Sequence, residues 1–155
     1  MTFKIESICF FPALVMNVYK SVSLEVSTGE SHRRLLLRCR AKLNSIEFRE
    51  GVVEALQHAE AHQIKQWLLD LREIGELDEE EEEWLQRYLF PCLMSKLGTG
   101  NYVAMVLSNR CYRNMEEQSG SFGLESYNEM VIIKVFCHLV DAESWLDGKE
   151  ASQAS

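Results

Sequence analysis

A short apolar run in the middle of the chain constrains the fold more than any other feature. Residues 67–71, WLLDL, are too short for a buried helix and have polar neighbours, so they predict a central strand buried on both faces. An unbroken acidic run, residues 78–83, follows, and apolar residues then recur at helical spacing. Because the helix dipole stabilises carboxylates in a first turn, the run fits the start of a helix. A buried strand followed by such a helix predicts a β-α-β unit.

The segments before this unit predict an antiparallel hairpin and then a helix. Apolar and polar residues alternate over 22–27 and again over 34–43, with turn residues between the two segments. The second segment has a basic face, which comprises Arg34, Arg38, Arg40 and Lys42. Asn44 and Glu47 have the spacing of an N-terminal capping box, and the apolar spacing after them predicts a helix ending near His62.

The second half of the chain predicts further β-α repeats. Pro91 is expected to kink or divide the helix that begins at Asp78, and Gly98 is expected to end it. Apolar segments predict strands at 102–107 and 131–136. Between them the pattern predicts irregular structure over residues 109–130, with a mobile loop at 117–126, and after them a terminal helix capped by Asp141.

This order predicts an α/β fold with a mixed sheet of about five strands. An N-terminal antiparallel hairpin would be followed by β-α repeats, with the helices mainly on one face of the sheet. We expect an N-terminal arm or edge element at 1–20, one domain at 21–147 and a disordered tail at 148–155.

Composition and motifs point away from several classes of protein. The net charge of −8 and the absence of aromatic residues from the basic face argue against nucleic acid as a partner. The five cysteines form no Cys-x-x-Cys pair, and His58 and His62 have no evident third ligand, so we expect no metal and no cofactor. No apolar run has membrane-spanning length, and no signal peptide is evident, so we expect a cytoplasmic protein.

Several segments resemble the SpoIIAA-like or STAS domain of bacterial anti-sigma-factor antagonists. They are Glu47-Phe48-Arg49, residues 67–72, Glu83-Trp84 with Pro91, and residues 141–146, so the resemblance covers about residues 20–147. It implies a bacterial regulatory domain that acts in signalling by binding a protein partner. In regulatory members, an Asp-Ser pair at a helix N-terminus carries the phosphorylated serine. The matching pair here is Asp78-Glu79, so the resemblance implies that the phosphoserine switch is absent.

Asp70 and Arg72 are further candidate site residues. Asp70 ends the central strand, at the edge where α/β proteins place ligands. The alternative is a structural role, in which Asp70 accepts backbone hydrogen bonds or pairs with Arg72. We favour the structural role, because a position in a fold does not by itself establish a site.

These observations predict a non-enzymatic STAS-like interaction or regulatory module. The alternatives are a carrier of a small apolar ligand or lipid and an enzyme that uses Asp70. We also expect a homodimer, because the strands 66–71 and 102–107 are apolar on both sides. An apolar second face needs a cover, which either residues 1–12 or a second subunit could provide.

Overall fold

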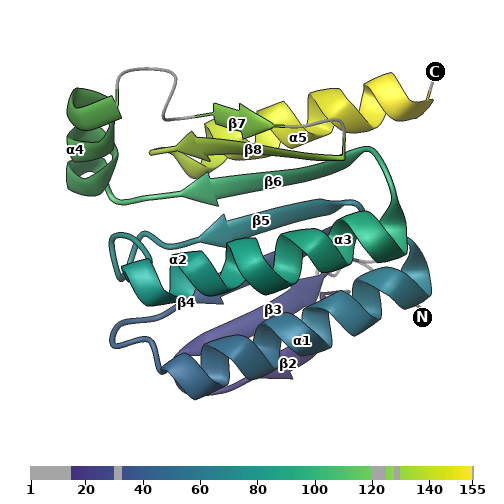
Figure 1. Cartoon of the computed structure of the whole chain (residues 1–155), viewed down its shortest axis with the longest axis horizontal. Coiled ribbons are helices and arrows are strands. Elements are labelled where there is room, and N and C mark those ends of the chain that lie inside the picture. The colour runs from purple at the N-terminus through teal and green to yellow at the C-terminus, as the bar shows by residue number, and fades with distance from the viewer. Residues whose placement is uncertain (1–14, 30–32, 120–124, 128–129, 155) are drawn as a thin grey trace, which may run out of the picture.

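The computed structural model describes residues 15–29, 33–119, 125–127 and 130–154. Within them, one sheet contains seven strands in the order β2-β3-β4-β5-β6-β8-β7 (Figure 1). The strands are β2 (Met16–Lys20), β3 (Leu24–Thr28), β4 (Arg34–Cys39), β5 (Gln66–Asp70), β6 (Asn101–Val106), β7 (Glu125–Tyr127) and β8 (Val131–Phe136). The predicted mixed α/β sheet is confirmed, and it is larger than predicted because β2 and β7 add an edge strand on each side.

The strand pairing follows the predicted division of the chain. β3 and β4 form the antiparallel hairpin, and β4, β5, β6 and β8 are consecutive parallel neighbours. β2 uses the end of the segment predicted as an arm or edge element and pairs antiparallel with β3. The remainder of that segment, residues 1–14, lies outside the described residues.

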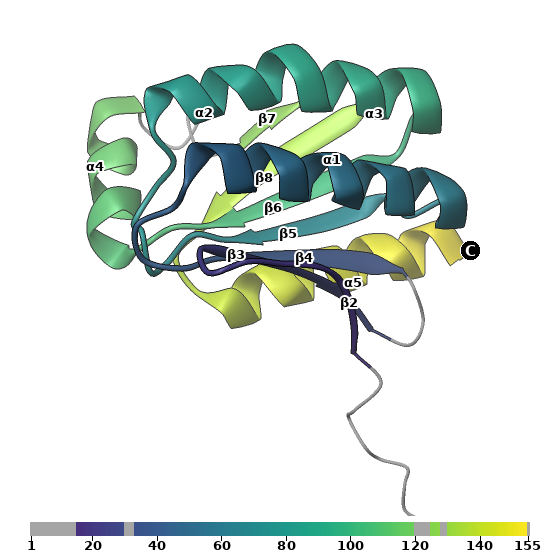
Figure 2. The same ribbon diagram turned by 90° about the horizontal axis from the view of Figure 1, so that it is seen from below.

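Helices cover both faces of the sheet (Figure 2). One face carries α1 (Ser45–His62) and a continuous helical run made of α2 (Glu79–Trp84), η2 (Leu85–Leu89) and α3 (Phe90–Leu97). The opposite face carries α5 (Leu139–Ala154), and α4 (Asn109–Ser119) lies beyond the carboxyl ends of the parallel strands. The helices therefore lie mainly, but not entirely, on one face.

The start of α1 explains how the hairpin and the helix are joined. The Asn44 side chain accepts a hydrogen bond from the Glu47 backbone N–H at 3.0 Å, so Asn44 is the predicted N-cap. Glu47 does not complete a capping box. Its carboxylate accepts a hydrogen bond from Ser23 Oγ at 2.6 Å, and Ser23 Oγ accepts one from the Asn44 N–H at 3.1 Å. Glu47 thus fastens the helix to β3.

Pro91 neither breaks nor divides the helical run. The five residues before α3 form a π-helical turn, in which the Phe90 N–H bonds to the Leu85 carbonyl. A proline ring clashes with the carbonyl four residues earlier and offers no N–H, and a widened turn accommodates both defects. Gly98 ends the run with a φ of 72°, as predicted.

Three element predictions need correction. Residues 109–119 form α4 rather than irregular structure, because Cys111, Tyr112 and Met115 pack against the core. The predicted mobile loop lies partly outside the described residues.

α5 begins at Leu139, so Asp141 is in its first turn and is not its cap. α5 also continues through most of the predicted tail, because one glycine costs a helix only about 1 kcal/mol and helix formers follow Gly148.

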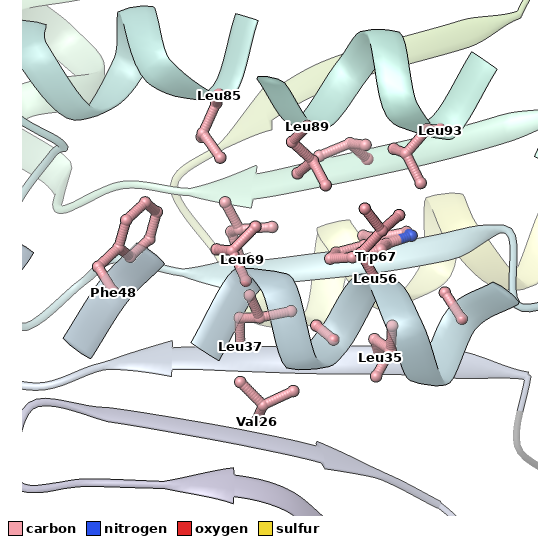
Figure 3. Close-up of a cluster of buried hydrophobic side chains, with 14 of the residues drawn as sticks. Val26, Leu35, Leu37, Phe48, Leu56, Trp67, Leu69, Leu85, Leu89 and Leu93 are labelled. Atoms are coloured by element: carbon pink, nitrogen blue, oxygen red, sulfur yellow. The ribbon is translucent and has the colours of Figure 1, made fainter. Parts of the chain in front are cut away.

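Two apolar clusters hold the layers together. The larger one fills the space between the sheet and α1, α2, η2 and α3, and it includes Trp67, Leu69, Leu85, Leu89 and Leu93 (Figure 3). The smaller one lies on the other face, where Leu68, Ala104 and Phe136 pack against Ala142 and Leu146 of α5.

The second cluster corrects the sequence argument for a homodimer. Leu68 and Ala104 point towards the second face, but α5 covers them within the same chain. The central strands therefore need neither residues 1–12 nor a second subunit as their cover. The homodimer stays a prediction without this ground.

Candidate functional site

Asp70 and Arg72 form a structural pair. Arg72 donates from Nε to Asp70 Oδ1 at 2.9 Å, from a guanidinium nitrogen to Oδ2 at 2.8 Å, and from its backbone N–H to Oδ1 at 3.2 Å. Asp70 is only 5% exposed. Burial by itself would raise the pKa of the Asp70 carboxyl, but the hydrogen bonds and charge of Arg72 outweigh burial and lower it. The structural alternative for Asp70 is the one this geometry favours.

The four candidate switch residues do not come together. Asp70 shares a sheet face with Leu68, which packs beneath α5. Asp78 and Glu79 begin α2, which lies on the opposite face (Figure 2). Asp78 is the N-cap residue of α2, but its side chain makes no cap hydrogen bond. Asp70-Arg72 and Asp78-Glu79 are therefore separate features.

The basic face does not form one positive surface, because each of its three arginines lies beside a carboxylate. Its fourth member, Lys42, lines a separate hollow together with Glu73, Glu76 and Asp78. Arg34 bonds to Gln66 and pairs with Asp147 at 2.7 Å. Arg38 lies 3.7 Å from Glu73, and Arg40 lies 3.8 Å from Glu25 across the hairpin. With these carboxylates beside the arginines, the strand face offers little net positive charge to a phosphate.

One carboxylate of the acidic run is structural, which the sequence did not predict. Glu81 is 4% exposed and accepts a hydrogen bond from Ser45 Oγ and two from Arg49, the closer at 3.1 Å. The Arg49 guanidinium also stacks over Trp84, 5.4 Å from the ring centroid. Glu81 and Trp84 are three residues apart on one helix face, so they clamp α2 to α1 together. This contact explains why an acidic residue shares a face with that tryptophan.

Three residues of the acidic run, Asp78, Glu79 and Glu82, lie at the rim of a hollow, whereas Glu80 pairs with Arg49 and Glu83 pairs with Arg87. Glu76, Leu77, Asp78, Glu79 and Glu82 line the hollow on one side, and Cys111, Asn114 and Gln118 of α4 line it on the other. Its volume is about 580 Å³. We call Glu76, Asp78, Glu79 and Glu82 the acidic rim. Among the residues that the structure describes, no cationic side chain forms an ion pair with any of these four.

An apolar cavity opens from the floor of this hollow. The two spaces share Glu76, Leu77, Glu82 and Met115, and the inner one has a volume of about 170 Å³. Its lining comes from α2, η2, α3, α4, β6 and β8 and the loops next to them: Glu76, Leu77, Glu82, Leu85, Gln86, Phe90, Met105, Leu107, Met115, Ile133 and Val135. Glu82 thus stands where the apolar cavity meets the acidic rim.

The position of Glu82 changes its acidity. Partial burial raises the pKa of the Glu82 carboxyl, and the negative charges of Glu76 and Glu79 raise it further. The site therefore holds a carboxylate that a nearby cation would stabilise.

Comparisons with known proteins leave the chain without an assigned family. No family model, no curated protein and no solved structure matches it.

Two further findings bear on the kind of site. In the described part of the chain, no group of three His, Cys, Asp or Glu side chains is placed to hold a metal ion. His58 and His62 stack on each other with ring centroids 4.2 Å apart. Across the same residues, no helix has the combination of length and apolar character that crossing a bilayer requires.

Proposed function

We propose that the chain is a non-enzymatic, STAS-like interaction module that binds a basic protein partner through the acidic rim, without a phosphoserine switch. The observation that carries this proposal is the unpaired state of the rim among the described residues. Elsewhere in the described structure, Glu25, Glu73, Glu81 and Asp147 each form an ion pair with an arginine. The rim instead concentrates negative charge beside a hollow.

Electrostatics favour a cationic partner at this place. Burial raises the pKa of the Glu82 carboxyl, and the negative charges of Glu76 and Glu79 raise it further, because like charges close together disfavour ionisation. A partner with lysine or arginine side chains would relieve that repulsion and would also be steered towards the rim before contact. The resemblance to STAS domains also favours this region as the binding surface, because the switch position of the family corresponds to Asp78-Glu79. A carboxylate at Glu79 would supply constant negative charge there.

The alternatives fit the geometry less well. An enzyme using Asp70 would need a carboxylate oxygen free to reach a substrate, but Arg72 occupies both oxygens. A lipid carrier would need an apolar cavity of about 300–1,000 Å³. The apolar cavity below Glu82 measures about 170 Å³.

Free thiols at Cys39, Cys92, Cys111 and Cys137 support a reducing compartment, so we place the module in the cytoplasm.

Affinity purification from the producing cells tests this function. The variant Asp78→Asn with Glu79→Gln removes two rim charges, and Glu54→Gln with Glu143→Gln removes two exposed charges elsewhere. We expect the wild-type chain and the second variant to retain a basic partner that the first variant loses. Raising the salt concentration should also weaken binding, since salt screens exposed charges. Equal retention by both variants, or recovery of no basic protein, would overturn the proposal.

A further inference from the structure

We propose that the cavity below Glu82 is a binding site for a small organic ammonium ion with a compact apolar body. The proposal is independent of the protein partner, because it rests on the cavity and its lining. Small-molecule sites typically combine an apolar enclosure with a few polar groups that fix the orientation of the ligand. This cavity has that composition, with apolar side chains on most sides and Glu82 at the opening.

The volume sets the size of the ligand. The cavity measures about 170 Å³, and a protein cavity of about 150 Å³ is known to hold benzene. One phenyl ring or a branched alkyl group of similar size therefore fits, whereas a fatty acyl chain does not. The apolar part of the ligand would contact side chains from three different elements, namely Leu85, Met105 and Val135. The cavity walls therefore depend on how η2, β6 and β8 pack together.

The charge at the opening sets the chemical class of the ligand. Glu76 and Glu82 line both the apolar cavity and the acidic hollow, so a group that projects from the cavity lies near carboxylates. Glu79 adds negative charge on the same side. An ammonium group would be attracted there, and a carboxylate or phosphate would be repelled by all three side chains. A short spacer would link the ring to the charge, because the apolar cavity and the acidic hollow adjoin each other.

The π-helical turn in the helical run helps to explain why the apolar cavity exists. The π-helical turn places one more residue in its turn than an α-helix would, and it supplies Leu85 and Gln86 to the lining. π-helical turns of this kind are rare and occur frequently at functional sites. The turn therefore accommodates Pro91 and also shapes one wall of the cavity.

A titration of the full chain with 2-phenylethylammonium tests the site. Isothermal calorimetry or amide NMR should show saturable binding at one site, with a dissociation constant of about 1 mM or tighter for a ligand of this size. Three other probes separate the contribution of the charge to binding from that of the ring. 3-Phenylpropionate has the opposite charge, 2-phenylethanol has no charge, and ethylammonium lacks the ring. We expect the amine to bind about fivefold more tightly than the alcohol, with no saturable binding of the other two.

Variants assign the binding to this cavity. Glu82→Gln keeps the shape of the side chain and should reduce the preference for the amine over the alcohol. Glu83→Gln is the matched control, because Glu83 is the next residue and does not line the cavity. Met115→Trp should fill the cavity and weaken both ligands. If the amine shows no saturable binding at millimolar concentration, binds no better than 3-phenylpropionate, or keeps its full preference in Glu82→Gln, the proposal is wrong. Loss of the protein partner would leave this result unaffected.

Discussion

Glu81 shows how neighbouring side chains in one acidic run can have opposite roles. Glu81 is buried and holds Ser45 and Arg49, whereas Glu79 is exposed at the start of the helix. The helical spacing assigns them to different faces. Stability measurements on the two positions should therefore differ, although both substitutions remove one carboxylate.

We predict that Glu81→Ala lowers the free energy of unfolding by about 2–3 kcal/mol, because it removes the acceptor of Ser45 and the closer acceptor of Arg49. Glu79→Ala should cost about 1 kcal/mol or less, which is the worth of an exposed first-turn carboxylate. Urea unfolding followed by circular dichroism measures both. Equal losses for the two variants would show that the contact with Arg49 does not clamp α2 to α1.

Glu82 should make the stability of the protein depend on pH in an identifiable way. Its pKa is raised in the folded state, so the folded protein binds the proton more tightly than the unfolded chain does. Ionised Glu82 therefore lowers stability above its folded pKa, and this loss is absent below the pKa of the unfolded chain. We predict that Glu82→Gln raises the melting temperature at pH 7 and that the difference disappears near pH 4. A gain of the same size at both pH values would mean that burial and charge are not its cause.

At the residue scale, the sequence predicted pairs that are close along the chain. Asp70 with Arg72 could be expected as a structural pair, because the two residues are nearly adjacent. Asn44 as the N-cap of α1 could be expected for the same reason. Glu81 with Arg49 could not, since the partners are far apart in sequence and six acidic residues were equivalent candidates. The spacing of Glu81 to Trp84 was the available signal.

At the scale of elements, two helical glycines provide a test of packing. Gly51 lies in α1 against β3 and β2, and a Cβ atom there would overlap Leu24 Cδ2 and approach Tyr19 to 3.0 Å. Leu24 is fully buried, so it has no room to move aside. Gly148 lies in α5, where a Cβ would meet nothing within 4 Å.

We predict opposite effects for the same substitution at these two positions. Gly148→Ala should stabilise the protein by up to about 1 kcal/mol, because alanine has the better helix propensity. Gly51→Ala has the same propensity gain but should destabilise the protein by about 1 kcal/mol overall, because overpacking costs more. Thermal unfolding of both variants measures the difference. A stabilised Gly51→Ala would contradict the close packing of α1 on the sheet.

The elements that the sequence predicted well are those with a complete periodic pattern. The sequence pattern predicted both the element and its buried residues in three cases. They are the alternation in β4, the fully buried apolar run of β5 and the apolar stripe of α1. The π-helical turn escaped prediction because it depends on how Pro91 is accommodated within packed surroundings. The helix α4 escaped because its few apolar residues become a pattern only beside the core that they contact.

At the scale of the whole molecule, the site is formed by segments that are distant in sequence. The loop after β5, the helical run, β6, α4 and β8 all contribute to the cavity. Strand order brings these segments together, so the cavity could not be read from any one motif. The acidic run was visible in the sequence, but the space behind it was not.

The location of the bound partner tests the proposed function most directly. Hydrogen–deuterium exchange of the wild-type chain, measured with and without the partner recovered from cells, reports which backbone amides the partner protects. We predict slower exchange in residues 76–90 and in α4 when the partner is bound, with little change in α5 or β2. Protection confined to α5 or to the β2–β4 edge, with residues 76–90 unchanged, would contradict binding at the acidic rim.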